Sequence, residues 1–315
     1  MSFLSTAVQT VLDEGPFCAV ATMTPDGPHC TPLVFAASGG RVWLTTSRRS
    51  VKARNWRTDP AMAGLVRHGD LAVTFTGTVK TYDALDRQTW GAAVAGATSI
   101  ARATALFSRK NARFFAGYAL DAKQVPFAWT PPGRVFVGVD LERTALLDDA
   151  GVQEGRGRWG GTATSHRTFR RTSGGADPLG AFPKEVSAEL GREGDGSLAI
   201  VGERGTVALP VRWRAEADAL YAALPAETLA LAGADEDAPM ALTLDKPSEW
   251  RARDMVGAMV QGSGASYVGG SVGSGAKTLR ALAGSIASEA TALVRLTPHR
   301  VVWWKGWTSG SARLR

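Results

Sequence analysis

The chain has 315 residues, of which 44% are hydrophobic, and this size and composition predict a globular protein with two domains. It carries 36 Lys and Arg against 29 Asp and Glu, a formal net charge of +7, and the basic residues are scattered along the chain. A nucleic-acid-binding protein concentrates such charge on one face or in a recognisable motif, and no zinc-finger, RNP or clear helix-turn-helix pattern occurs. The charge therefore gives little support to a nucleic-acid partner.

The N-terminus and the cysteines bear on where the protein works. The first residues lack a basic region followed by an apolar stretch, so we expect no signal peptide, and no apolar run approaches the length of a membrane span. We therefore expect a cytoplasmic protein with no membrane partner. Cys18 and Cys30 are interpreted as buried thiols, and the four histidines lack the spacing of metal ligands, so we predict no metal site.

The first half of the sequence predicts a meander of hairpins. Turn signals such as Thr-Pro-Asp-Gly at residues 24–27 separate runs of high β propensity. These runs predict strands at residues 17–23, 29–37, 41–46, 62–67, 71–82 and 134–147. A short helix is expected at residues 52–57, because the residue before Pro60 disfavours helix. Alanine-rich spacing predicts further helix within residues 83–118, with a break near the glycines.

Residues 151–180 change the character of the chain. They are rich in Gly, Arg, Ser and Thr and lack apolar periodicity, which predicts a linker or a long surface loop. The basic centre of this segment, at residues 166–171, is most simply a solvated charge run, and the alternative is a lid over an anionic ligand. We therefore expect a first domain at residues 1–150, a linker at residues 151–182 and a second domain at residues 183–315.

After the linker, the order of elements in the first half returns. Residues 197–213 echo residues 17–35, residues 258–267 echo residues 73–82, and residues 293–304 echo residues 136–147. The matched positions are Pro32 with Pro210, Gly77 with Gly262, Tyr82 with Tyr267, and Arg143 with Arg300. Because the matches recur in the same order, they predict an internal duplication.

A basic corner is the best candidate for a functional site. A predicted strand ends in two threonines, and basic and hydroxyl side chains then follow through a turn into the start of a helix. The corner contains Thr45, Thr46, Arg48, Arg49, Ser50, Lys52 and Arg54. Free backbone N–H groups and cationic side chains at a strand-to-helix turn favour a phosphate. The alternative is a solvated basic helix start without a ligand.

The residues of the first half resemble a known family. The hairpin GPFCAVATMTPDGPHCTPLVF, the run GGRVWLTTSRRSVKARNWRTDP and the strand end GTVKTYDA are similar to the pyridoxamine 5′-phosphate oxidase-like proteins, also called FMN-binding split barrels, and their deazaflavin relatives. The resemblance covers most of residues 10–147 and is traceable over residues 196–307. It implies a mainly β fold with α-helices (α+β), in which two fused split β-barrels form an intramolecular pseudo-dimer. Association of two chains into a homo-oligomer stays open.

The resemblance also implies roles for individual residues. In the family, the strand end and the basic corner bind the cofactor phosphate and part of the isoalloxazine, which assigns these roles to the corner residues named above. His29 and Thr31, on the second strand, are expected near the flavin ring. This chain departs from the family at Val51, where a basic residue is usual. The second half has no cations in residues 222–239 and has acids at 235–237, so we predict one cofactor site per chain.

The implied function is a flavin-dependent oxidoreductase acting on a small-molecule substrate. Its cofactor is FMN or the deazaflavin coenzyme F-420, with FMN as the first choice, and no catalytic residue is assigned. The alternative is a non-catalytic flavin or haem binding protein of the same fold. Trp303, Trp304 and Trp307 are expected to pack in the core or an interface, with stacking on a flavin as the alternative.

Overall fold

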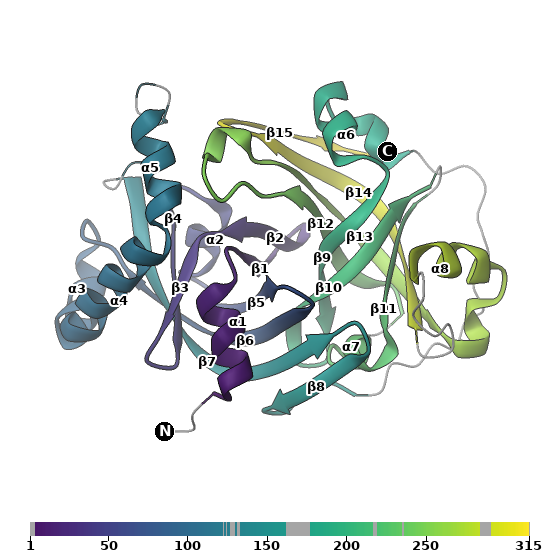
Figure 1. Ribbon diagram of the computed structural model, residues 1–315, viewed down its shortest axis with the longest axis horizontal. Helices are drawn as coiled ribbons and strands as arrows, with labels where there is room; N and C mark the ends of the chain where they lie inside the picture. The colour runs from purple at the N-terminus through teal and green to yellow at the C-terminus, as the bar shows by residue number, and fades with distance from the viewer. Residues whose placement is uncertain are drawn as a thin grey trace.

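The computed structural model shows two antiparallel β-sheets that roll into barrels and pack against each other (Figure 1). It describes residues 4–121, 123, 125–126, 130, 133–161, 177–216, 219–234, 236–283 and 291–314. The fold is mainly β with helices at its periphery, and the two fused split barrels implied by the resemblance are confirmed.

The first sheet has the strand order β2-β1-β5-β6-β7-β4-β3, with β8 paired to β7. Its strands are β1 (Cys18–Thr24), β2 (Gly27–Leu33), β3 (Phe35–Ser38), β4 (Arg41–Ser47), β5 (Ala61–His68), β6 (Leu71–Tyr82), β7 (Arg134–Asp148) and β8 (Gly151–Arg156). Alternation along β1 gives this sheet two buried faces, because Cys18 and Val20 point into the first barrel whereas Ala19 and Ala21 face the second.

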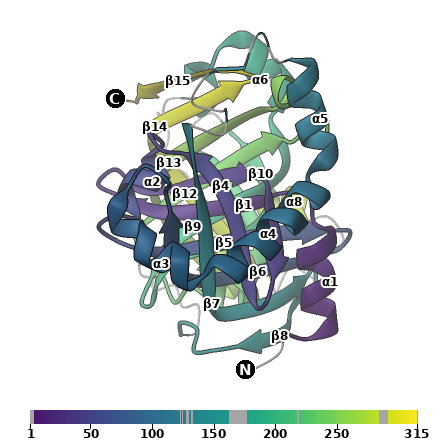
Figure 2. The ribbon, with the colours of Figure 1, turned by 90° about the vertical axis from the view of Figure 1, so that its left-hand side faces the viewer.

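Helices cover the outside of the first sheet. They are α1 (Thr6–Glu14), α2 (Val51–Asn55), the 3₁₀ turn η1 (Arg87–Thr89), α3 (Trp90–Ala95), α4 (Ala97–Lys110) and α5 (Ala112–Leu120). In α1 the buried residues Val8, Val11 and Leu12 follow helical spacing, and Ser5 caps the helix by accepting a hydrogen bond from the Val8 N–H. Figure 2 shows α3, α4 and α5 following one another across the first barrel.

The second sheet has the order β11-β10-β9-β12-β13-β14-β15, and β11 also pairs with β14. Its strands are β9 (Glu193–Gly202), β10 (Gly205–Ala215), β11 (Leu220–Pro225), β12 (Ala238–Lys246), β13 (Val256–Val268), β14 (Thr291–Lys305) and β15 (Thr308–Arg313). The helices around it are η4 (Pro178–Ala181), α6 (Lys184–Leu190), α7 (Ala226–Ala230), η5 (Ala252–Asp254), η6 (Gly269–Gly275) and α8 (Ala276–Ala283).

The two sheets repeat each other residue by residue, which confirms the predicted duplication. The ladder between β6 and β7 shifts register between Thr76 and Gly77, and the ladder between β13 and β14 shifts between Gln261 and Gly262. A Cβ at either glycine would collide with a carbonyl oxygen of the neighbouring strand. Both bulges therefore require glycine.

The interface between the barrels has approximate two-fold symmetry. Thr243 Oγ1 donates a 2.7 Å hydrogen bond to the Cys30 carbonyl, and Thr74 Oγ1 donates one of the same length to the Ala208 carbonyl. Cys30 and Ala208 occupy equivalent positions, each three residues after the glycine that closes its hairpin turn. Each barrel thus presents the same hairpin to the other, as in an isologous dimer. The two barrels therefore form a pseudo-dimer within one chain.

The structure differs from the sequence-based expectations in three places. The strand expected at residues 29–37 is interrupted at Val34, and β3 pairs with β4 instead of continuing the hairpin with β1. Residues Gly151–Arg156, expected in the linker, form β8 on the edge of β7. The helical stretch at 83–118 breaks at Gly96 between α3 and α4, as its glycines predict, and it breaks again at Asn111 between α4 and α5, where no glycine predicts a break. Residues 166–171, interpreted as a charge run or a lid, lie outside the described residues.

Two further observations concern the cysteines and the helices. Cys18 and Cys30 are both buried and unbridged, as predicted. No helix in the described part of the chain is long and apolar enough to cross a membrane.

Candidate functional site

The hydroxyl groups of the basic corner build the turn from β4 into α2. Thr46 Oγ1 donates to Ser50 Oγ at 3.1 Å, and Ser50 Oγ accepts a hydrogen bond from the Ala53 N–H, also at 3.1 Å. Ser50 is therefore the N-cap of α2. These contacts fix the start of the short helix and set the direction in which its side chains leave.

Lys52 points inward from α2 and meets two residues of β2. Its side chain is buried, with 3% exposure, and its Nζ donates to Thr31 Oγ1 and lies 3.4 Å from His29 Nδ1. In the strand order, β2 is at one end and β4 is next to last at the other end. Lys52, on the helix that follows β4, therefore connects the two ends of the sheet. The structure therefore brings together three of the predicted site residues.

The charges of this group depend on burial. Burial, followed by the positive charge of Lys52, lowers the pKa of His29 to about 3, so the imidazole is neutral. Because Nδ1 faces the ammonium donor, the ring proton sits on Nε2. Burial also lowers the pKa of Lys52 to about 8. Among the described residues no carboxylate forms an ion pair with this amine, so its positive charge is uncompensated.

The arginines of the corner point in different directions. Arg48 forms a two-pronged ion pair with Asp83, with Nε–Oδ2 and Nη2–Oδ1 distances of 2.7 and 2.6 Å. The Asp83 side chain is only 3% exposed, and the hydrogen bond from Arg48 lowers its pKa. Arg49 and Arg54 are exposed. The four cations of the corner thus differ in environment. Lys52 is buried, Arg48 is held in an ion pair, and the other two face the solvent.

Thr45 faces the opposite side of β4, where the outer helices enclose a cavity of about 510 Å³. The lining includes Val34, Phe107, Phe114, Phe115, Tyr118, Arg134 and Phe136. Arg134 is fixed to the strand edge, because its Nε donates to Thr45 Oγ1 at 3.0 Å and its Nη2 donates to the Thr45 carbonyl at 2.7 Å. The cavity is therefore an aromatic slot with one positive charge on its wall, suited to a flat ring.

Sequence reasoning missed this aromatic wall and Arg134. The helical residues Phe114, Phe115 and Tyr118 lie within a stretch that predicts only a helix, and Arg134 opens a predicted strand. The one sequence signal was the density of aromatic residues between 107 and 118, in a helical region otherwise rich in alanine.

The second barrel holds the outer helix of this cavity in place. Asp121, which follows α5 and has a side chain 3% exposed, pairs with Arg251 at 2.6 Å and Arg253 at 3.4 Å. The rings of Tyr118 and Trp307 meet edge to face, with their centroids 5.4 Å apart. The cavity is lined by residues of the first half, so the second barrel contributes support to its wall instead of lining it.

The equivalent positions of the second barrel are apolar. The register of the two sheets matches His29, Thr31, Thr45 and Thr46 with Val207, Leu209, Ala223 and Leu224, and these four are buried. Helix α7 begins directly after Pro225, and its second residue is Glu227, whereas Lys52 is the second residue of α2. Of the acids noted in the sequence, Asp235 lies outside the described residues. The polar set of the first barrel is thus absent from its copy.

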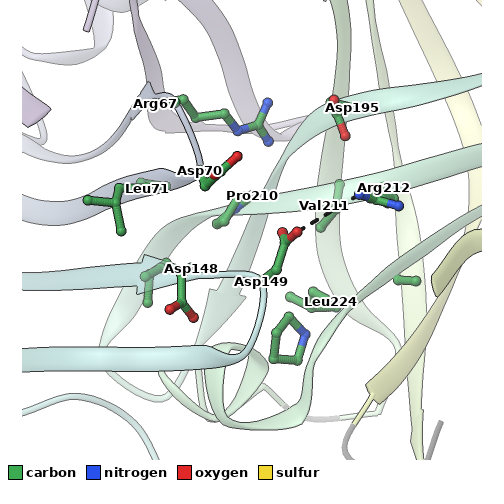
Figure 3. Close-up of a pocket in the computed structure, with 15 residues that line it drawn as sticks. Arg67, Asp70, Leu71, Asp148, Asp149, Asp195, Pro210, Val211, Arg212 and Leu224 are labelled. Carbon is green, nitrogen blue, oxygen red and sulfur yellow. Dashed lines mark ion pairs between the residues drawn. The ribbon is translucent and has the colours of Figure 1, made fainter. Parts of the chain in front are cut away.

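A second cavity, of about 190 Å³, lies between the barrels (Figure 3). Asp149 forms a 3.9 Å ion pair with Arg212 at its wall, and Arg67 donates to the Gly196 carbonyl. Its walls therefore mix acids and arginines that pair with each other or with the backbone. None of the site residues predicted from the sequence lines it.

Comparisons with known proteins bear on the first barrel. Residues 4–127 match the family model of pyridoxamine 5′-phosphate oxidase. The resemblance noted in the sequence is thereby confirmed for this part of the chain, which is similar to that family. No curated protein matches the chain.

Three solved structures that are similar to this chain each cover less than half of it. One is an FAD-binding protein from Mesorhizobium loti, with 19% identity, covering 45% of this chain and 94% of its own, at a TM-score of 0.33. An F420 reductase has 18% identity, covering 45% and 98% at a TM-score of 0.31. An FMN-binding protein from Nostoc punctiforme related to pyridoxamine 5′-phosphate oxidase has 17% identity, covering 44% and 77% at a TM-score of 0.31.

Proposed function

We propose that this chain binds one flavin-type cofactor, FMN or F-420, in its first barrel and uses it as an oxidoreductase on a small-molecule substrate. The observation that carries the proposal is the pairing, on the two faces of one strand end, of an aromatic cavity with a buried lysine that has no carboxylate partner among the described residues. The family match of residues 4–127 supports the same assignment.

The residues present fit such a cofactor. The aromatic lining suits a flat isoalloxazine or deazaflavin ring, and Arg134 supplies a positive charge beside it. A buried ammonium group without a counter-ion is costly, and an anionic group nearby would compensate it. We assign the anionic tail to Lys52 and to the exposed Arg49 and Arg54, none of which is among the residues that line the aromatic cavity. Val51 contributes no charge there.

The flavin, when bound, supplies hydride or electron transfer. The side chains of this protein bind and orient it. The phenyl rings of α4 and α5 exclude water from the slot, and the contact of Arg134 with Thr45 keeps one cation at a fixed position on the wall. The neutral imidazole of His29 donates only through Nε2, since Nδ1 faces Lys52.

A non-catalytic flavin or haem binding protein is the second candidate. It is favoured by the composition of the cavity wall, because the described lining contains no Asp, Glu, His or Cys that could act as a general acid or base. A protein that only stores or carries its chromophore needs no such group.

Purified protein separates these possibilities. We expect it to show flavin or deazaflavin absorbance with one chromophore per chain, identified by mass spectrometry, and to be bleached by a hydride donor and reoxidised in cycles. A chromophore that binds but never turns over supports the non-catalytic protein. Failure to bind FMN, F-420 or haem, even when each is added in excess to the apoprotein, would refute the proposal.

A further inference from the structure

Each barrel extends one hairpin toward the other barrel, and the residues before the closing glycines of the two hairpins have opposite charges. The tip of the β1–β2 hairpin carries Asp26, one residue before Gly27, and the tip of the β9–β10 hairpin carries Arg204, one residue before Gly205. Both glycines have positive φ, 99° and 93°, so the two tips share one turn geometry. The tips nevertheless present opposite charges to equivalent surfaces.

At the first tip, a carboxylate meets the bulge arginine of the opposite barrel. Arg300 Nη1 donates to Asp26 Oδ2 at 2.7 Å, and Arg313 Nη2 donates to Asp26 Oδ1 at 3.1 Å. Arg300 lies opposite Gln261 at the bulge of the second sheet, and its Nη1 is 3.5 Å from Gln261 Oε1. One carboxylate thus accepts hydrogen bonds from two guanidinium groups across the interface.

At the second tip, the equivalent arginine has no carboxylate in this position. Arg143 Nε donates to Thr76 Oγ1 at 2.7 Å, and Nη2 donates to the backbone carbonyl of Arg204 at 2.8 Å. Nη1 is buried and has no hydrogen-bond partner among the described residues. A buried donor without a partner destabilises the folded protein. At the first tip a carboxylate lies beside the bulge arginine, whereas the equivalent position at the second tip is occupied by Arg204.

A cavity of about 240 Å³ lies at this second tip. Its lining includes the hydrogen-bond donors Arg143, Arg204, Thr76, Thr78 and Thr206, together with two carboxylates. Both carboxylates already accept hydrogen bonds, Glu142 from Thr78 Oγ1 and Asp59 from the Ala61 N–H at 3.0 Å. Burial lowers the pKa of Arg143; Glu142 opposes this shift and the charge of Arg204 adds to it.

We propose that this cavity binds a small anion, through a phosphate or carboxylate group that takes the place held by the Asp26 carboxylate at the other tip. Arg143 and Arg204 line the cavity with one guanidinium each from the two barrels, and Arg143 Nη1, which is buried, must turn toward the cavity to donate to the anion. A water occupies about 30 Å³ in the liquid, so the cavity has room for a phosphate and several waters. The site tightens the contact between the barrels and does not involve the residues proposed to hold the flavin.

Thermal unfolding of the full chain in inorganic phosphate, with ionic strength held constant by chloride, tests the site. We expect a saturable rise in Tm of about 3 °C at a tenfold excess over the dissociation constant. Arg204→Asp restores the carboxylate of the other tip, so its Tm without phosphate should rise and its response to phosphate should be lost. Arg143→Gln should also lose the response, whereas Arg212→Gln, at the cavity of Figure 3, should keep it.

Each other outcome overturns the proposal. An unresponsive parent protein shows that the cavity holds no phosphate. A response that survives in Arg204→Asp shows that phosphate binds elsewhere, and its loss in Lys52→Met would place it at the proposed cofactor site. Because the Arg204→Asp variant adds a favourable ion pair, its result stands even if Arg143→Gln does not fold. Flavin absorbance, followed separately, reports on the proposed function alone.

Discussion

The two barrels share one strand order, yet only the first encloses a large aromatic cavity against its outer helices among the described residues. On the same face of the second sheet, α8 and η6 pack on Tyr221, Tyr267 and Leu293 in a closed apolar cluster. Tyr221 occupies the position of Trp43 in the first sheet, and both are buried. The two barrels thus keep a similar arrangement of strands, although the space that is a cavity in the first barrel is filled by side chains in the second.

The buried polar residues teach the same lesson in energetic terms. The first barrel keeps the buried Thr46 and Lys52 where its copy has the buried Leu224 and the exposed Glu227, although polar groups stabilise a core less than apolar ones do. A barrel folds well without them, as the second one shows. Folding therefore does not account for their presence in the first barrel, whereas the proposed binding role does.

The largest expected effect concerns the buried lysine. Lys52→Met should weaken flavin binding about 100-fold, because it removes a charge-assisted contact to the anionic tail, and should leave the fold intact. The matched change in the second barrel, Glu227→Met, should leave flavin affinity unchanged. Fluorescence titration measures both dissociation constants, and equal losses would show that the two barrels do not differ in the way described.

The clamp on α5 gives the next effect. Asp121→Asn should lower the free energy of unfolding by about 2 kcal/mol, because two arginines lose a buried carboxylate. Asp254→Asn removes an exposed partner of Arg253 and should change the free energy by less than about 0.5 kcal/mol. Urea denaturation compares the two, and similar small values for both would mean that the clamp does not hold the barrels together.

Filling the cavity tests its role more locally. Ala119→Trp places an indole at the cavity wall and should weaken flavin binding about tenfold by occupying space needed for the ring. Ala116, like Ala119, is exposed on α5, but it does not line the cavity. The control variant Ala116→Trp should therefore bind flavin as the parent protein does. An unchanged dissociation constant in Ala119→Trp would move the ring out of this cavity.

The pH dependence should be the smallest effect. The pKa of Lys52 in the folded apoprotein is lowered to about 8, so the amine is charged below this pH and loses its proton as the pH rises through it. Affinity for an anionic flavin should therefore fall about fourfold between pH 7 and 8.5. Lys52→Met should show a flat profile over this range; a parent profile equally flat would exclude Lys52 as the group that binds the tail.

Much of this architecture could be predicted from the sequence because its signals are local. Turn residues and strand propensity predict the hairpins. The matched glycines Gly77 and Gly262 predict the duplication, and both lie at bulges in the structure. The resemblance also nominated His29, Thr31 and Lys52, which the structure brings together.

The remainder depends on contacts between distant segments. Arg48 and Arg54 belong to the same basic corner of the sequence, but Arg48 pairs with Asp83, 35 residues away, and Arg54 faces solvent. The support of α5 by Arg251 joins residues 130 positions apart. The break at Val34 is likewise set by which strand β3 pairs with. Composition and periodicity carry no information on such pairings.

The joining of both barrels in one chain has a consequence for how this interface can change over time. In an assembly of identical subunits, every substitution appears twice, and a residue must suit its own symmetry mate. Here a single substitution alters one hairpin tip and leaves the other untouched, so the matching turns can carry an aspartate and an arginine. A chain that contains both halves thus allows each of them to change without the other.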